Sequence, residues 1–139
     1  MAVAERWIID TSAYVRLTRS ADPDLWFDRI ERGVVSVSTV TLLELGYSAR
    51  SATDWRQGIR QPPVSKLLVE PLTPTMEERA LAVQGLLAVR GHHRTAKVPD
   101  LLIAAIGERA RLTVLHVDKD FDLIAEVTGQ SMERLAGNF

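Results

Sequence analysis

The chain has 139 residues, of which 46% are apolar and 25% are charged. Its 17 basic and 18 acidic side chains give a net charge of −1, which excludes nucleic-acid binding through a uniformly basic surface. Size and composition are those of one globular domain, residues 1–139, and not of a disordered, fibrous or membrane chain. The absence of cysteine excludes disulfides, thiolate metal ligands and a cysteine nucleophile.

The amino-terminal segment lacks the pattern of a secretory signal. It carries Glu5 and Asp10 where such a signal needs a basic start and an apolar run. The longest clean apolar stretch, residues 101–106, is far shorter than the ~20 residues that a membrane-spanning helix needs. We therefore expect a soluble cytoplasmic protein without a membrane segment.

Short β-branched runs alternate with longer amphipathic segments along the chain. This alternation predicts an α/β domain in which helices flank a mainly parallel sheet of four or five strands. The predicted strands lie at residues 6–9, 34–37, 66–69, 112–117 and, as a short edge strand, 131–135.

Helices are predicted between these strands from capping residues and apolar spacing. Ser38 or Thr39 opens a helix that runs to about residue 50, and Pro99 opens the most apolar one, residues 100–110. Residues 22–24 open another helix that Gly33 ends, and residues 73–75 open one that stops before Gly91. Residues 118–120 precede the last helix, which Gly129 stops.

Acidic side chains recur where predicted strands end or the following helices begin. Asp10 directly follows the first strand, Asp118 follows the fourth, and Asp120 comes two residues later. Asp100 lies in the first turn of the most apolar helix, and Glu44 lies about one and a half turns into the helix after the second strand. Because ligands of open parallel sheets bind beyond the carboxyl ends of the strands, we expect these side chains to converge there.

Each acid also has an ordinary structural interpretation. Asp100 and Asp120 at helix starts would interact favourably with the helix dipole, and Asp10 would serve as a simple N-cap. Glu44 differs, because apolar residues flank it on both sides of its helix, and we expect it to be buried with a partner. No Lys or Arg lies one turn away to pair with it.

Carboxylates gathered in one place repel each other unless a cation lies between them. Mg²⁺ and Mn²⁺ prefer oxygen ligands, and Mg²⁺ commonly uses one or two carboxylates and keeps several waters. The histidines offer no cluster for a softer metal, since His92 and His93 lie in a polar loop and His116 is alone on a strand. Such an acidic site is suited to phosphodiester hydrolysis by a metal-activated water.

Three segments together resemble the PIN-domain ribonucleases, and closely the VapC toxins of bacterial type II toxin–antitoxin operons. They are WIIDTSAYVRL, VSVSTVTLLELGYSAR and VPDLLIAAIGERARLTVLHVDKDFDLIAEVTGQ, in the order and spacing of the family over essentially the whole chain. The most specific match is PDLLIAA followed by LHVDKDFDLIAEVTG. The resemblance implies a single PIN domain with an α/β/α sandwich fold, and a Mg²⁺- or Mn²⁺-dependent endoribonuclease.

Position by position, the resemblance assigns the acidic quartet of the family to Asp10, Glu44, Asp100 and Asp118. Asp10 and Asp100 match the positions usually bound to the ion, with Asp118 and Asp120 as further candidates. We rank Asp120 below Asp118, because Asp120 is also positioned to cap its helix. Thr11 or Ser12 matches the small hydroxyl residue that supports the first aspartate.

An RNA backbone approaches an acidic site only where a metal and basic groups compensate the repulsion. The segment of residues 90–97 supplies such groups beside Asp100, although a solvated connector is an equally simple interpretation. Its candidate RNA-binding residues are Arg90, His92, His93, Arg94 and Lys97.

The resemblance also implies protein partners. Toxins of this family are inhibited by a cognate VapB-type antitoxin whose tail lies across the toxin, and they commonly form homodimers and toxin–antitoxin hetero-oligomers. We expect apolar surface for that tail at residues 26–27 and 47–55.

Two other functions fit part of the pattern. A phospho-acceptor receiver domain also binds Mg²⁺ through acids at strand ends. It requires two adjacent acids after the first strand, where Ile9-Asp10 offers one, and a strand-terminal lysine, for which Lys119 is badly placed. The second alternative is a PIN module that binds RNA without cleaving it.

Overall fold

The computed structural model describes residues 4–139, so residues 1–3 of the predicted domain lie outside the described part of the chain. The described residues form a parallel sheet with the strand order β3-β2-β1-β4-β5. The strands are β1 (Trp7–Ile9), β2 (Val35–Ser38), β3 (Leu68–Glu70), β4 (Thr113–His116) and β5 (Met132–Arg134). All five predicted strands are present, including the edge strand near the carboxyl terminus.

Helices occupy most of the chain between the strands. They are α1 (Thr11–Tyr14), α2 (Pro23–Glu31), α3 (Thr39–Tyr47), α4 (Ala52–Arg60), α5 (Pro74–Val89), α6 (Val98–Ala110) and α7 (Asp120–Thr128). The helix predicted to begin at Ser38 or Thr39 is confirmed with Ser38 as its N-cap, but it ends at Tyr47 and not at about residue 50. The chain leaves the helix after Tyr47, and Ser51 opens a separate helix, α4, by accepting a hydrogen bond from the Asp54 N–H. Across residues 4–139, none of the helices combines the length and the apolar character needed to cross a bilayer.

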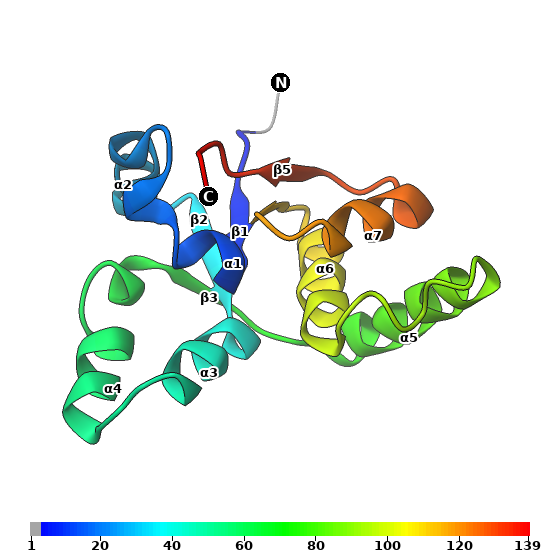
Figure 1. The fold of residues 1–139 in the computed structure, drawn as a ribbon, viewed down its shortest axis with the longest axis horizontal. Helices are drawn as coiled ribbons and strands as arrows, with labels where there is room; N and C mark the ends of the chain where they lie inside the picture. The colour runs from blue at the N-terminus through cyan, green and yellow to red at the C-terminus, as the bar shows by residue number, and fades with distance from the viewer. Residues whose placement is uncertain (1–3) are drawn as a thin grey trace.

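The sheet separates two apolar cores (Figure 1). Helices α5, α6 and α7 pack on one face, against Ile8 and Val114, while α1 and α2 pack on the other face, against Trp7, Ile9 and Leu115. Neighbouring residues of β1 and β4 thus point to opposite cores, as the alternation of side chains along a strand requires. Helices covering both faces explain why the central strands are apolar almost throughout.

Helix α6 lies especially close to the sheet. A Cβ atom on Gly107 would be 2.8 Å from Cγ2 of Val114 and 3.3 Å from Cγ2 of Ile8. The glycine therefore allows the helix axis to approach β1 and β4. Asp100 lies in the first turn of the same helix.

The strand order rules out the receiver-type alternative. Strand β1 lies between β2 and β4, and β3 lies outside β2. A receiver domain has the order 2-1-3-4-5, in which the third strand is next to the first. In the order seen here, the chain changes direction across the sheet between β1 and β4, and ligands of open parallel sheets bind at such a point. Asp10 and Asp118 follow these two strands.

Candidate active site

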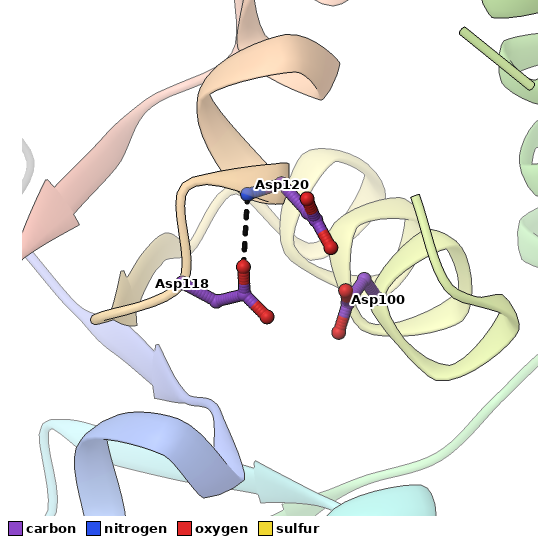
Figure 2. Close-up of side chains that lie close together, drawn as sticks. All are labelled: Asp100, Asp118 and Asp120. Carbon is purple, nitrogen blue, oxygen red and sulfur yellow. Dashed lines mark hydrogen bonds between the residues drawn. The ribbon is translucent and has the colours of Figure 1, made fainter. Parts of the chain in front are cut away.

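Three aspartates gather at the carboxyl edge of the sheet (Figure 2). Asp100, Asp118 and Asp120 each offer one carboxylate oxygen to a group in which these oxygens lie within 4.8 Å of one another. We call these three residues the aspartate cluster. Asp100 comes from the first turn of α6, whereas Asp118 lies between β4 and α7 and Asp120 begins α7. The predicted convergence is therefore observed for these three acids.

Asp10 borders the cluster from the end of β1. It is buried and caps α1, because its Oδ2 accepts hydrogen bonds from the Ser12 N–H at 3.0 Å and from the Ser12 hydroxyl at 2.6 Å. Its negative charge contributes to the raised pKa of Asp100, which shows that the two carboxylates share one electrostatic environment. Asp10 therefore meets both expectations, since it caps a helix and also lies beside the other acids.

Glu44 lies outside the aspartate cluster and is held by a hydroxyl group. Its Oε1 accepts a hydrogen bond of 2.8 Å from Thr11 Oγ1, which brings α3 to the residue directly after Asp10. The expectation that Glu44 is buried is wrong, since it is only half-buried. One side of its helix faces solvent, where Leu43 is 69% exposed and Tyr47 is 92% exposed.

The cluster is electrostatically unfavourable for three ionised carboxylates. Burial, together with the charges of Asp10, Asp118 and Asp120, raises the pKa of Asp100 from 3.8 to about 7. Burial, followed by the charge of Asp118, also raises the pKa of Asp120. Oδ2 of Asp100 is buried and has no hydrogen-bond partner within the described chain. A buried, unpartnered carboxylate oxygen beside further carboxylates fits a bound divalent cation.

We expected Asp120 to cap its helix, but Asp118 makes the capping hydrogen bond. Oδ1 of Asp118 accepts the backbone N–H of Asp120 at 3.0 Å, so Asp118 satisfies the start of α7 (Figure 2). Asp120 is buried, whereas Asp118 is half-buried. The carboxylate of Asp120 therefore remains available to the cluster.

Lys97 is the member of the basic segment that lies at the aspartate cluster. Its Nζ is 3.7 Å from Oδ2 of Asp118, and its charge lowers the pKa values of Asp100 and Asp120. Arg90 instead lies 3.8 Å from Glu126, six residues beyond Asp120, which is roughly 9 Å along α7. His93 and Arg94 are exposed, and Nδ1 of the half-buried His92 is buried without a partner in the described residues.

Comparison with known proteins identifies the family. The family model of the PIN domain matches residues 7–127. The chain belongs to the PIN-domain family. It is 59% identical over 131 residues to Ribonuclease VapC2 of Mycobacterium tuberculosis, covering 94% of this chain and 93% of that protein. It is 44% identical to Ribonuclease VapC51 of the same species, covering 92% and 91%. These relatives place the chain in the VapC group of PIN domains.

Solved structures confirm the PIN-like α/β/α fold. A chain of DNA-bound VapBC from Salmonella typhimurium superposes with a TM-score of 0.75 at 18% identity, covering 94% of this chain and 98% of that one. A chain of VapBC-1 from nontypeable Haemophilus influenzae gives a TM-score of 0.72 at 17% identity, covering 92% and 96%. At this level of identity the similarity concerns the fold alone.

The PIN domain exposes only one of the two apolar surfaces expected for a partner. Trp26 is buried, and its ring packs edge-on against Trp7 with 5.2 Å between centroids, so the surface predicted at residues 26–27 is wrong for this residue. By contrast, Tyr47 and Trp55 are exposed on α3 and α4. A Cβ atom on Gly46 would lie 2.6 Å from Nε1 of Trp55, so the glycine allows α4 to pack closely on α3.

Sequence reasoning overlooked His116 as part of this region of the PIN domain. It ends β4 and is buried, with its ring 5.0 Å from that of Phe121 at the start of α7. Burial lowers the pKa of His116, which favours the neutral imidazole. The alternation of side chains along β4 could have identified His116. This alternation places residue 116 on the same face as Val114, towards α6 and α7.

Proposed function

We propose that this protein is the toxin of a type II toxin–antitoxin system and a Mg²⁺- or Mn²⁺-dependent endoribonuclease. The aspartate cluster carries the proposal, because it brings one oxygen from each of three carboxylates, two of them buried, to within 4.8 Å of one another at the carboxyl edge of the sheet in a PIN domain. The names of the two relatives, both ribonucleases, support it. In this proposal residues 1–139 form a single PIN domain that acts on RNA in the cytoplasm.

The carboxylates at this edge of the sheet have different roles in the proposal. Asp10 and Asp100 would hold the ion, with Asp118 and Asp120 completing its surroundings directly or through waters. When bound, the ion stabilises the negative charge that develops on the phosphodiester and lowers the pKa of the attacking water. Glu44 has one oxygen occupied by the Thr11 hydroxyl and retains the other to orient a water. Ser12, which donates to Asp10, supports the first ligand.

The basic segment would guide the RNA backbone to this acidic edge. Lys97 lies beside Asp118 but is exposed, so it can move its ammonium group to a phosphate. Arg94 and His93 are exposed nearby in sequence, and His92 is half-buried. We expect a smaller contribution from Arg90, because its guanidinium is paired with Glu126. A local basic segment is compatible with the net charge of −1, because contacts to an RNA backbone at this place need no uniformly basic surface.

A VapB-type antitoxin would bind along α3 and α4. A surface cavity of about 460 Å³ is lined by Leu43, Tyr47 and Glu44, among others, and thus combines apolar side chains with one carboxylate. An amphipathic antitoxin segment with apolar residues and one basic residue matches this lining. The similarity of the fold to chains of VapBC structures supports this partner, and we include self-association into homodimers in the proposal.

The deciding experiment is cleavage of total cellular RNA by the purified protein, with the cleavage ends mapped. We expect defined ends with Mg²⁺ or Mn²⁺ and none with a chelator. Asp10→Asn and Asp100→Asn should abolish cleavage while the protein stays folded. RNA that is bound but never cut with either metal would support the non-cleaving PIN module instead.

A further inference from the structure

The last residue of α3, Tyr47, presents an aromatic ring to solvent. Its side chain is 92% exposed, more than any other large apolar side chain of residues 4–139. Tyr47 comes three residues after Glu44, so the two side chains are neighbours on the surface of the helix. An open aromatic face is suited to stacking against another flat ring. The end of α3 therefore offers a stacking surface one turn from an acid of the proposed site.

A cavity connects Tyr47 with the acidic edge of the sheet. Thr11, which directly follows Asp10, donates the 2.8 Å hydrogen bond to Glu44, and both of these side chains line the cavity. Its volume is about 460 Å³, and its other lining residues are Val40, Leu43, Tyr47 and Ser48. Sites for small organic ligands commonly measure about 300–1,000 Å³. The cavity can therefore hold one planar ring system directly beside the acids.

Helix α4 and its flanking loops carry unpaired positive charge. Asp54 is the only acid of residues 48–66, whose basic residues are Arg50, Arg56, Arg60 and Lys66. All four basic side chains are exposed, and none of them makes an ion pair within the described part of the chain. Arg56 and Arg60 lie one helical turn apart, and like charges at this spacing destabilise a helix. A bound anion would relieve this repulsion.

Tyr47 and the arginines of α4 belong to one surface. Helices α3 and α4 lie side by side (Figure 1). Trp55 of α4 packs against the backbone of Gly46, where an added Cβ atom would be 2.6 Å from the indole Nε1. The guanidinium of Arg60 in turn lies over the Trp55 ring, 5.5 Å from its centroid. Aromatic rings and positive charge thus adjoin beside the acidic edge, and this combination binds single-stranded nucleic acids.

We propose that α3 and α4 bind the RNA strand beside the cleaved bond, with one unpaired base stacked on Tyr47 and the backbone in contact with Arg56 and Arg60. This inference deepens the proposed function and rests on RNA as its substrate. Every base offers a flat face, whereas the bases of a duplex are covered by their neighbours. The contact therefore selects unpaired RNA and not a particular base. The antitoxin segment proposed for the same cavity would exclude the base while it is bound.

The first test compares strands with and without bases. The probes are a short fluorescent single-stranded RNA and a ribose-phosphate strand of the same length that lacks bases, both bound to the Asp100→Asn background. Tyr47→Leu keeps an apolar side chain but removes the ring. It should weaken RNA binding at least ~5-fold and leave binding of the base-free strand unchanged. Tyr47→Phe keeps the ring and should bind RNA as tightly as before. Phe139→Leu is the matched control, because it removes an exposed ring at the carboxyl terminus.

The second test removes the charges of α4. Arg56→Ala/Arg60→Ala should weaken binding of both strands, since their backbones are the same. Loss of two phosphate contacts should lower the slope of log K against log salt concentration by about 1.4. Arg109→Ala/Arg111→Ala removes two exposed charges at the other end of α6 from Asp100 and controls for the change in net charge. Circular dichroism checks that every variant is folded.

Three results would overturn the inference. They are unchanged RNA binding in Tyr47→Leu, an equal loss of binding for the base-free strand, and a salt slope that changes equally in the two arginine variants. A Tyr47→Leu variant that loses only its affinity for an antitoxin would assign the surface to that partner and overturn the RNA contact as well.

The inference and the nuclease proposal fail separately. RNA that binds through Tyr47 but is never cut would contradict the nuclease and support the inference. A wild type that cuts RNA, beside a Tyr47→Leu variant that binds and cuts it equally well, would contradict the inference alone.

Discussion

The side chain of Ser12 is hydrogen-bonded to the backbone of Val117, 105 residues further along the chain. Its Oγ accepts the Val117 N–H at 3.0 Å and donates to Oδ2 of Asp10 at 2.6 Å. Because Val117 directly precedes Asp118, one hydroxyl group fixes the spacing between the acid after β1 and the acid after β4. Ser12 thus helps to position the two acids of the proposed metal site through the two loops that it joins.

Ser12→Ala should lower both stability and metal affinity. The change removes one donor from Asp10 and leaves the Val117 N–H without its partner, which costs about 1–3 kcal/mol. Ser20→Ala is the matched control, since Ser20 is also buried and donates a 2.6 Å hydrogen bond, to the Leu17 carbonyl away from the acids. Thermal unfolding and calorimetric titration with Mn²⁺ measure the two effects. Equal metal affinity in the two variants would contradict a positioning role for Ser12.

Asp100→Asn should stabilise the metal-free protein at neutral and alkaline pH. Folding raises the pKa of Asp100 from 3.8 to about 7, so the folded state binds more protons than the unfolded state between these values. The contribution of Asp100 to stability therefore falls as the pH rises from about 4 to 7, by roughly 4 kcal/mol in total. Above pH 7 the full penalty applies, and the asparagine variant lacks it.

Urea denaturation at pH 5 and pH 8 in the presence of a chelator measures this difference. We expect the gain in stability of Asp100→Asn to be larger at pH 8 than at pH 5. Mg²⁺ should stabilise the wild type and leave the variant unchanged. Asp24→Asn, an exposed acid in the first turn of α2, is the control that removes a carboxylate outside the cluster. If the gain in stability is the same at both pH values, the carboxylate of Asp100 is not the group whose ionisation destabilises the folded protein.

The parallel sheet and the acidic edge could be predicted because both depend on local patterns. Strand ends and first helical turns are visible in the sequence, and parallel strands bring all their carboxyl ends to one edge. Asp10, Asp100 and Asp118 were identified in this way. The capping interaction between Asp118 and Asp120 was not, because it depends on the path of three residues after β4.

The errors arose where the sequence pattern alone does not decide whether a residue is buried or where a helix begins. Leu43 and Tyr47 have the spacing of a buried helix face, and sequence alone cannot distinguish burial in the core from exposure to a partner. Helix α4 was missed because its residues, ATDWRQGIR, are mostly polar, and its cap at Ser51 was not recognised. Trp26 shows the reverse error, since packing against Trp7 buries a residue that we expected at the surface.

Glu44→Gln should reduce RNA cleavage almost as strongly as loss of Asp10 or Asp100. Thr11→Val should have a smaller effect, because it removes only the hydroxyl that holds Glu44 at 2.8 Å. A hydrogen bond to a charged group contributes about 1.5–3 kcal/mol, which sets the expected loss at about 10-fold or more. Thr11→Ser keeps the hydroxyl and should restore most of the activity. Single-turnover cleavage rates with Mg²⁺ give these values, and full activity of Glu44→Gln would exclude Glu44 from the reaction.

Replacing Arg94 and Lys97 by alanine should weaken RNA binding and reduce its dependence on salt. Each phosphate contact to a single strand contributes about 0.7 to the slope of log K against log salt concentration, so losing two contacts should lower the slope by about 1.4. The matched control is Arg109→Ala/Arg111→Ala, which removes two exposed charges at the other end of α6, away from Asp100. Binding of a fluorescent single-stranded RNA to the Asp100→Asn background, measured from 50 to 300 mM salt, avoids cleavage during the titration. If the slope changes equally in both double variants, the loss reflects overall charge, and residues 90–97 do not form the RNA contact.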